Sequence, residues 1–140
     1  MLSHYRLLAG VLFLELSFAL ALRIVSWPTL RRLMPWLRPA GVLLTGRSPE
    51  HRLLWAMDAT GRRWPSLRNC LVRALVAELA LATSREPVRV TIGVRRIAGE
   101  LQAHAWVERC GRLIVGDPAA HDAATRAQFA PLVTWQSPRA

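Results

Sequence analysis

The hydrophobic pattern of this sequence changes its period once, at Pro87. Before this proline, apolar residues recur at helical spacing, and the clearest stripe consists of Leu71, Ala74, Leu75, Leu79 and Ala82. After it, apolar and polar residues alternate, and the apolar ones are Val88, Val90, Ile92 and Val94. A chain with this order of periods packs its early helices on a sheet made from later residues. The pattern therefore predicts an α+β fold.

Cap and turn residues set the expected boundaries of these elements. The Ser48 hydroxyl is expected to cap a helix that ends near Gly61, and Asn69 to cap a second helix from Cys70 to about Ser84. We expect strands over residues 88–95, 101–108 and 112–117, and a short closing helix over 122–130. Residues 39–46 have the composition of a linker. We therefore divide the chain into an N-terminal segment, 1–46, and a domain, 47–140, which form one compact unit.

The N-terminal segment contains an apolar run over residues 7–22 that allows three interpretations. A membrane span is disfavoured because the run is shorter than the ~20 residues that cross a bilayer and carries Glu15 at its middle. A signal peptide is the second alternative, with a small-residue cleavage site at residues 19–21. We favour a helix that packs on the domain, on a partner or on a membrane surface. The basic, tryptophan-containing stretch at 27–38 suits such an interface.

Composition limits the remaining classes of protein. The 140 residues are 52% hydrophobic, which excludes a disordered chain. The net charge of +10 comes entirely from Arg, and because no nucleic-acid motif accompanies it, we expect no nucleic-acid partner. Two cysteines, 40 residues apart, form neither a disulfide scaffold nor a zinc site. No metal or cofactor is expected.

Cys70 is the candidate nucleophile. As the first residue of a predicted helix it meets unpaired N–H groups and the positive end of the helix dipole, which favour a thiolate. A thiolate needs only a base and an acid that orients the base. The alternative is a small buried side chain that only packs.

His104 and Asp117 are the candidate base and orienting acid. Strand alternation places His104 on the same face as Trp106. If Cys110-Gly111 is a two-residue turn, Arg109 pairs with Arg112 and His104 lies opposite Asp117. Directly paired side chains share a face, with Cβ atoms about 4.5–5.5 Å apart, so the carboxylate can hold the imidazole. The alternatives are a structural histidine and an Asx turn at Asp117.

Four stretches together resemble the lasso peptide leader peptidases of bacteria, which are small transglutaminase-like cysteine proteases. They are the segment from Asn69 to Leu75, Ile92-Gly93-Val94-Arg95, the segment from Ala103 to Glu108, and Gly116-Asp117. The resemblance covers roughly residues 62–120. It implies a Cys70–His104–Asp117 triad on a papain-like or transglutaminase-like core. In that core the cysteine helix packs on a small antiparallel sheet and is preceded by helices.

The resemblance also implies a function and partners. The protein would remove the leader of a lasso peptide precursor, and a separate ATP-dependent cyclase would then close the macrolactam ring. A separate leader-recognition protein is implied as well. The location is expected to be cytoplasmic, and peripheral membrane association through residues 7–38 is left open. Two alternatives stay open: a transglutaminase or deamidase on the same core, and a non-enzymatic basic protein that contacts a membrane through residues 7–38.

Overall fold

The computed structural model describes residues 2–81, 87–116 and 123–137. Its helices are α1 (Leu2–Ile24), α2 (Trp27–Thr45), α3 (Glu50–Arg63), the single 3-10 turn η1 (Pro65–Leu67), α4 (Cys70–Ala80) and α5 (Ala123–Ala127). Its strands are β1 (Arg89–Ile97), β2 (Glu100–Arg109), β3 (Arg112–Val115) and β4 (Ala130–Gln136). The strands form one antiparallel sheet in the order β3-β2-β1-β4. The α+β class predicted from the change of period is confirmed.

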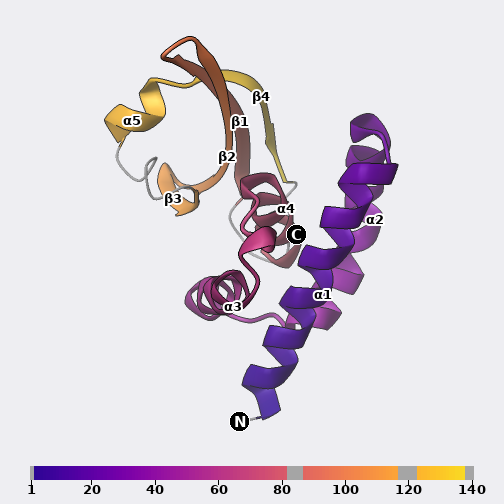
Figure 1. Ribbon diagram of the computed structural model, residues 1–140. Coiled ribbons are helices and arrows are strands. Elements are labelled where there is room, and N and C mark those ends of the chain that lie inside the picture. The colour runs from indigo at the N-terminus through magenta and orange to yellow at the C-terminus, as the bar shows by residue number, and fades with distance from the viewer. Residues whose placement is uncertain (1, 82–86, 117–122, 138–140) are drawn as a thin grey trace.

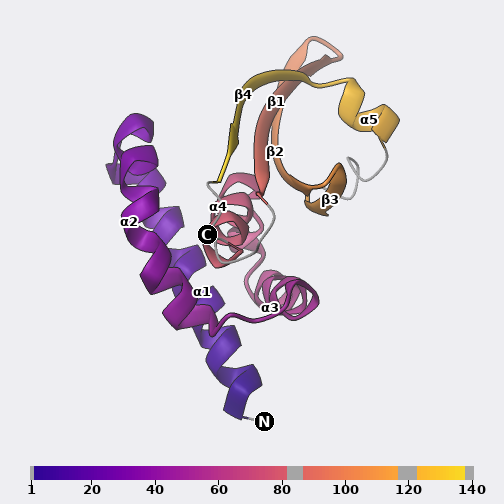
Figure 2. The same cartoon turned by 180° about the vertical axis from the view of Figure 1, so that it is seen from behind.

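Helix α4 lies at the centre of the molecule. Figures 1 and 2 show it between the curved sheet and a layer made by the antiparallel helices α1 and α2. The buried core runs through all three parts, because side chains of α1, α2, α4 and the sheet belong to one cluster; its members include Val11, Leu14, Met34, Leu75, Leu79, Val90 and Val107. The N-terminal helices therefore supply part of the core that holds α4.

Helix α2 corrects the predicted linker over residues 39–46. The helix continues through Pro35 and Pro39 to Thr45, although a proline inside a helix costs about 3 kcal/mol. Packing against α4 offsets this cost: a Cβ on Gly41 would lie 2.6 Å from Cγ of Leu79, so only glycine permits such a close approach. The helix ends at Gly46, which adopts a left-handed conformation (φ 66°).

The boundaries of α3 also differ from those predicted. Pro49 occupies the N-cap position of α3, and the Ser48 hydroxyl instead donates a hydrogen bond to the Thr45 carbonyl at 2.6 Å. The helix ends at Arg63, two residues beyond the expected end. Glu50 in its first turn binds Arg109 and Arg112 of the β2–β3 hairpin, and these ion pairs attach α3 to the sheet. The acid near the helix start therefore has a tertiary role beyond the dipole interaction.

Strand β4 is an element that the sequence analysis missed. It follows α5 and pairs with β1 along the edge of the sheet. Trp135 on this strand contacts α2 and α4, whereas most other β4 side chains are exposed. Apolar and polar residues therefore do not alternate clearly along β4. The strand is defined by its pairing with β1.

Candidate active site

The start of α4 is built around Asn69 and Cys70. Asn69 is the N-cap, as predicted, and its Oδ1 accepts hydrogen bonds from the amides of Leu71 (2.9 Å) and Val72 (3.3 Å). The Asn69 carbonyl accepts from the amide of Arg73. Cys70 is the first helical residue, its thiol is free, and its side chain is partly buried against the core.

The cap leaves one amide of the first helical turn for another partner. The amides of residues 71–73 are all accepted by Asn69, whereas the amide of Cys70 has no acceptor within the part of the chain that the structure describes. An N–H beside a nucleophile is positioned to donate to the oxygen that becomes negative during acyl transfer. Asn69 uses its side-chain oxygen as an acceptor, so its structural role is the cap.

His104 lies on β2, directly opposite Gly93 of β1. Its ring packs edge-on against Phe129, with 5.1 Å between centroids, and Phe129 also contacts Trp106. The prediction that His104 and Trp106 share a face is confirmed by their common contact with Phe129. A Cβ on Gly93 would lie 2.7 Å from the Trp106 ring and 2.9 Å from Cβ of Phe129, so glycine is required beneath this aromatic cluster.

Gly93 and Phe129 are residues of this site that sequence reasoning missed. A glycine inside a strand pattern signals close approach of another group, and Gly93 carried that signal. Phe129 carried none, because it falls in the predicted closing helix and its contact with His104 joins residues that are far apart in the sequence.

The β2–β3 hairpin corrects the predicted register in part. Cys110-Gly111 forms the expected turn, with both residues at positive φ, and Arg109 pairs with Arg112. A bulge then shifts the pairing, so that Val107 lies opposite Val115 instead of Ile114. The extra residue lets two consecutive side chains, Ile114 and Val115, both enter the core, which a regular alternating strand does not allow. Asp117 lies outside the described residues, so its predicted contact with His104 stays a prediction.

The structure brings the elements that carry Cys70 and His104 into contact, because α4 packs on β2. The face of β2 that meets α4 carries Ala105 and Val107, which belong to the main core, whereas His104 lies on the face with Trp106 and Phe129. Within the described residues no hydrogen bond joins the Cys70 thiol to the His104 ring. The Cys70–His104 contact of the predicted triad therefore stays a prediction.

The second cysteine does not compete for this role. Cys110 is exposed in the β2–β3 turn at a φ of 50°, so it is not a residue of a helix start. Among the described residues, no group of three or more His, Cys, Asp or Glu side chains could hold a metal ion. Cys70 therefore has a free thiol at a capped helix start. Beside it lies an amide N–H with no acceptor among the described residues, and the adjoining sheet carries a histidine. This set of groups suits thiol-dependent acyl transfer.

The comparison with known proteins agrees with this class. A model of the transglutaminase-like superfamily matches residues 12–134, and the chain belongs to that superfamily. Its members are generally cysteine-dependent enzymes with protease or acyltransferase activity. No curated protein and no solved structure matches the chain. The match begins inside α1, so the N-terminal helices are part of the superfamily region.

Proposed function

We propose that this protein is a cysteine peptidase that removes the leader from a lasso peptide precursor, with Cys70, His104 and Asp117 as its triad. The observation that carries the proposal is the start of α4, where a free thiol stands beside an amide that donates to no acceptor among the residues that the structure describes. Membership of the transglutaminase-like superfamily supports thiol chemistry. The resemblance of the segments around Cys70 and His104 to leader peptidases supports the substrate.

The proposed reaction is a two-step hydrolysis. The Cys70 thiolate attacks the carbonyl carbon at the end of the leader, and the Cys70 amide donates to the developing oxyanion. As the carbon–nitrogen bond breaks, protonated His104 gives its proton to the leaving amine, which is the new N-terminus of the core peptide. His104 then removes a proton from water, and the hydroxide releases the leader from the thioester. Asp117 is proposed to orient the imidazole and stabilise its charged form.

Mass spectrometry of the products tests this reaction. The purified protein is incubated with a lasso precursor and its separate leader-binding protein. Hydrolysis yields two fragments whose summed mass exceeds that of the precursor by one water. An uncleaved precursor that has lost ammonia by amine transfer would instead establish a transglutaminase. An uncleaved precursor in which an amide has become an acid would establish a deamidase.

Substitution of the nucleophile provides the matched control. We expect Cys70→Ala to abolish cleavage, because no other thiol stands at a helix start, and Cys110→Ala to cleave at the wild-type rate. Circular dichroism shows whether each variant keeps its fold. Substantial cleavage by folded Cys70→Ala protein would refute the cysteine-peptidase proposal.

Asp117→Asn tests the acid of the proposed triad. Loss of the carboxylate removes the charge that stabilises imidazolium, so we expect turnover to fall by about 10- to 10⁴-fold. Single-turnover rates with the same precursor measure the effect. Unchanged turnover would mean that another group orients His104.

A further inference from the structure

The outer face of the α1–α2 layer is apolar and uncovered. Along α1, exposed side chains follow one helical stripe, which consists of Tyr5, Ala9, Phe13, Leu16, Leu20 and Ile24. On α2 the exposed apolar side chains include Leu33, Trp36 and Leu43, and Trp36 is 82% exposed. Figures 1 and 2 show both helices on the side of α4 that faces away from the sheet. We call this surface the outer face.

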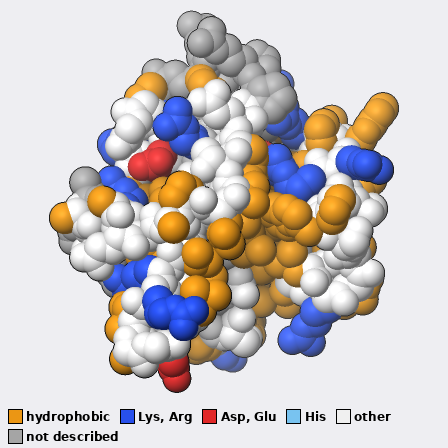
Figure 3. All heavy atoms as spheres, turned by 90° about the horizontal axis from the view of Figure 1, so that it is seen from above, with side chains coloured by type: hydrophobic (Ala, Val, Ile, Leu, Met, Phe, Trp, Pro, Cys, Tyr) orange, Lys and Arg blue, Asp and Glu red, His pale blue; other side chains and the backbone are white. Residues whose placement is uncertain are grey.

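The charge of the outer face has one sign. Exposed arginines accompany the apolar stripes at Arg6, Arg23 and Arg32, and Arg6 donates a hydrogen bond to the Leu43 carbonyl of α2. The only acid in residues 2–49 is Glu15, which is 1% exposed and faces the interior. In Figure 3 the helical side of the molecule, on the right, shows apolar and arginine side chains and no acidic ones. Exposed apolar groups beside arginines, without acids, complement an anionic lipid surface.

The packing of α1 distinguishes a surface position from a membrane span. By length and composition α1 could cross a membrane, since Ser3–Ile24 has a mean hydropathy of 2.1, but the same test is passed by core helices and signal sequences. The opposite side of α1 is buried in the domain through Leu7, Val11 and Phe18. A span would remove these side chains and Glu15 from the core, whereas a surface position leaves them in place.

We propose that the outer face docks this protein peripherally on an anionic bilayer, with the apolar stripes in the interface and the arginines at the lipid headgroups. Figures 1 and 2 show α4 between the α1–α2 layer and the sheet, so docking through the outer face leaves the sheet uncovered. The proposal does not depend on the peptidase reaction. Cys70→Ala protein should bind vesicles as the wild type does, which separates the two proposals experimentally.

Co-sedimentation with vesicles tests the docking. We expect binding to phosphatidylglycerol vesicles that weakens as salt is raised, and little binding to phosphatidylcholine vesicles. Bound protein should be released by carbonate at high pH. Protein that leaves the vesicles only in detergent would overturn the proposal in favour of a span, and equal binding to both lipids would overturn the role of charge.

Matched variants assign the binding to the outer face. Leu20→Ser with Trp36→Ser removes apolar area from it, and we expect vesicle affinity to fall by at least about tenfold. Leu101→Ser with Leu132→Ser removes two comparably exposed side chains from the sheet and should leave affinity unchanged.

Charge variants complete the test. Arg23→Gln and Arg32→Gln should each lower the affinity for anionic vesicles about fivefold. Arg62→Gln, which changes an exposed arginine of α3 outside the outer face, should not lower it. Equal effects of the outer-face and control variants would overturn the proposal. Dimerisation in solution that the outer-face double variant abolishes, without vesicle binding by the wild type, would assign the face to a second copy instead.

Discussion

Glu15 shows how one side chain can oppose the packing of its helix. The residue lies on the buried side of α1, and neither carboxylate oxygen has a hydrogen-bond partner in the described part of the chain. Burial raises the pKa of Glu15 above its ordinary value, and the charge of Arg73 on the facing helix offsets only part of this effect. The Thr60 hydroxyl donates its hydrogen bond to the Met57 carbonyl instead. The protonated form of Glu15 is therefore the form that fits the core.

Because of this environment, we expect Glu15→Gln to increase the stability of the fold by an amount that depends on pH. Because the pKa of Glu15 is raised in the folded state, its contribution to folding stability is greatest at low pH. This contribution is lost as the pH rises through the folded-state pKa. A neutral amide avoids the loss, so the variant should be more stable than wild type at neutral pH, and its advantage should shrink as the solution is acidified.

Urea unfolding between roughly pH 4 and pH 8 measures the difference. Glu100→Gln, at an exposed acid at the start of β2, is the control and should show no such trend. A loss of stability in Glu15→Gln at neutral pH would indicate that the ionised carboxylate is held by Arg73.

At the scale of the element, α4 depends on its cap. The Asn69 side chain accepts hydrogen bonds from two amides of the first turn. These amides belong to the positive end of the helix dipole, where Cys70 lies. Asn69→Ala removes the acceptor and should cost about 1 kcal/mol, which lowers the melting temperature by about 3–6 °C. Asn69→Ser keeps an acceptor and should recover most of the loss. Calorimetry checks both variants, and an unchanged melting temperature in Asn69→Ala would mean that water replaces the cap at no cost.

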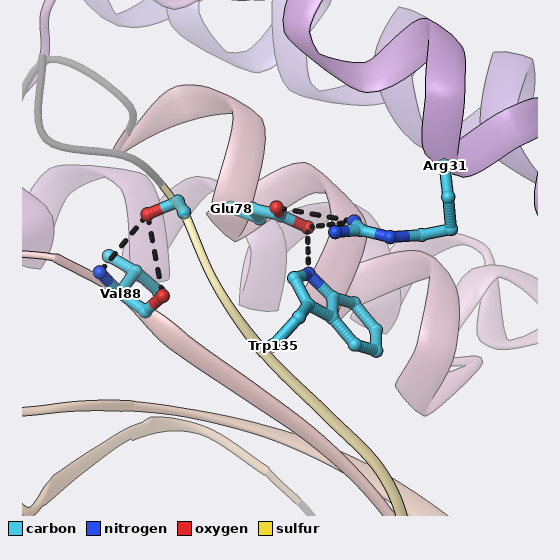
Figure 4. A network of polar contacts seen from close by, with 5 residues as sticks. Arg31, Glu78, Val88 and Trp135 are labelled. Atoms are coloured by element: carbon cyan, nitrogen blue, oxygen red, sulfur yellow. Dashed lines mark hydrogen bonds and ion pairs between the residues drawn. The ribbon is translucent and has the colours of Figure 1, made fainter.

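At the scale of the whole molecule, one polar network joins the three layers. Glu78 of α4 is 3% exposed and accepts from Arg31 of α2 at 3.0 Å and from the Trp135 indole of β4 at 2.9 Å, as Figure 4 shows. The Arg31 guanidinium also lies 4.1 Å from the centroid of the Trp135 ring. The helical layer, the cysteine helix and the edge strand are therefore held at a single point.

Arg31→Met should destabilise the fold by about 2–3 kcal/mol, because it leaves a buried carboxylate without its cation. The same change in a Glu78→Gln background should cost much less, since no charge then remains unpaired. Arg32→Met, at the exposed neighbouring position, is the matched control. Equal losses in both backgrounds would show that Arg31 acts through its stacking on Trp135 and not through its charge.

Local chemistry explains what could be predicted from the sequence alone. The Asn69 cap, the strands β1 and β2 and the turn at Cys110-Gly111 depend on residues near each other in the chain, and each appears close to where it was expected. The expected alternation of buried and exposed side chains does not hold, because Thr91 and Trp106 are buried as well. The same locality placed Cys70 at the start of a helix and His104 on the face with Trp106. The α+β class and the candidate nucleophile therefore followed from the sequence.

Contacts between distant residues decided the rest. Helix α2 passes through two prolines because Gly41 packs on Leu79, and β3 bulges because Ile114 and Val115 both reach the core. Strand β4 exists through pairing with β1, and Phe129 reaches His104 only in the folded chain. Periodicity shows that a helix has an apolar side, but neighbouring elements determine which side is buried. For α1, the inward packing of Val11, Glu15 and Phe18 shows that the opposite side, with Phe13, Leu16 and Leu20, forms the outer face.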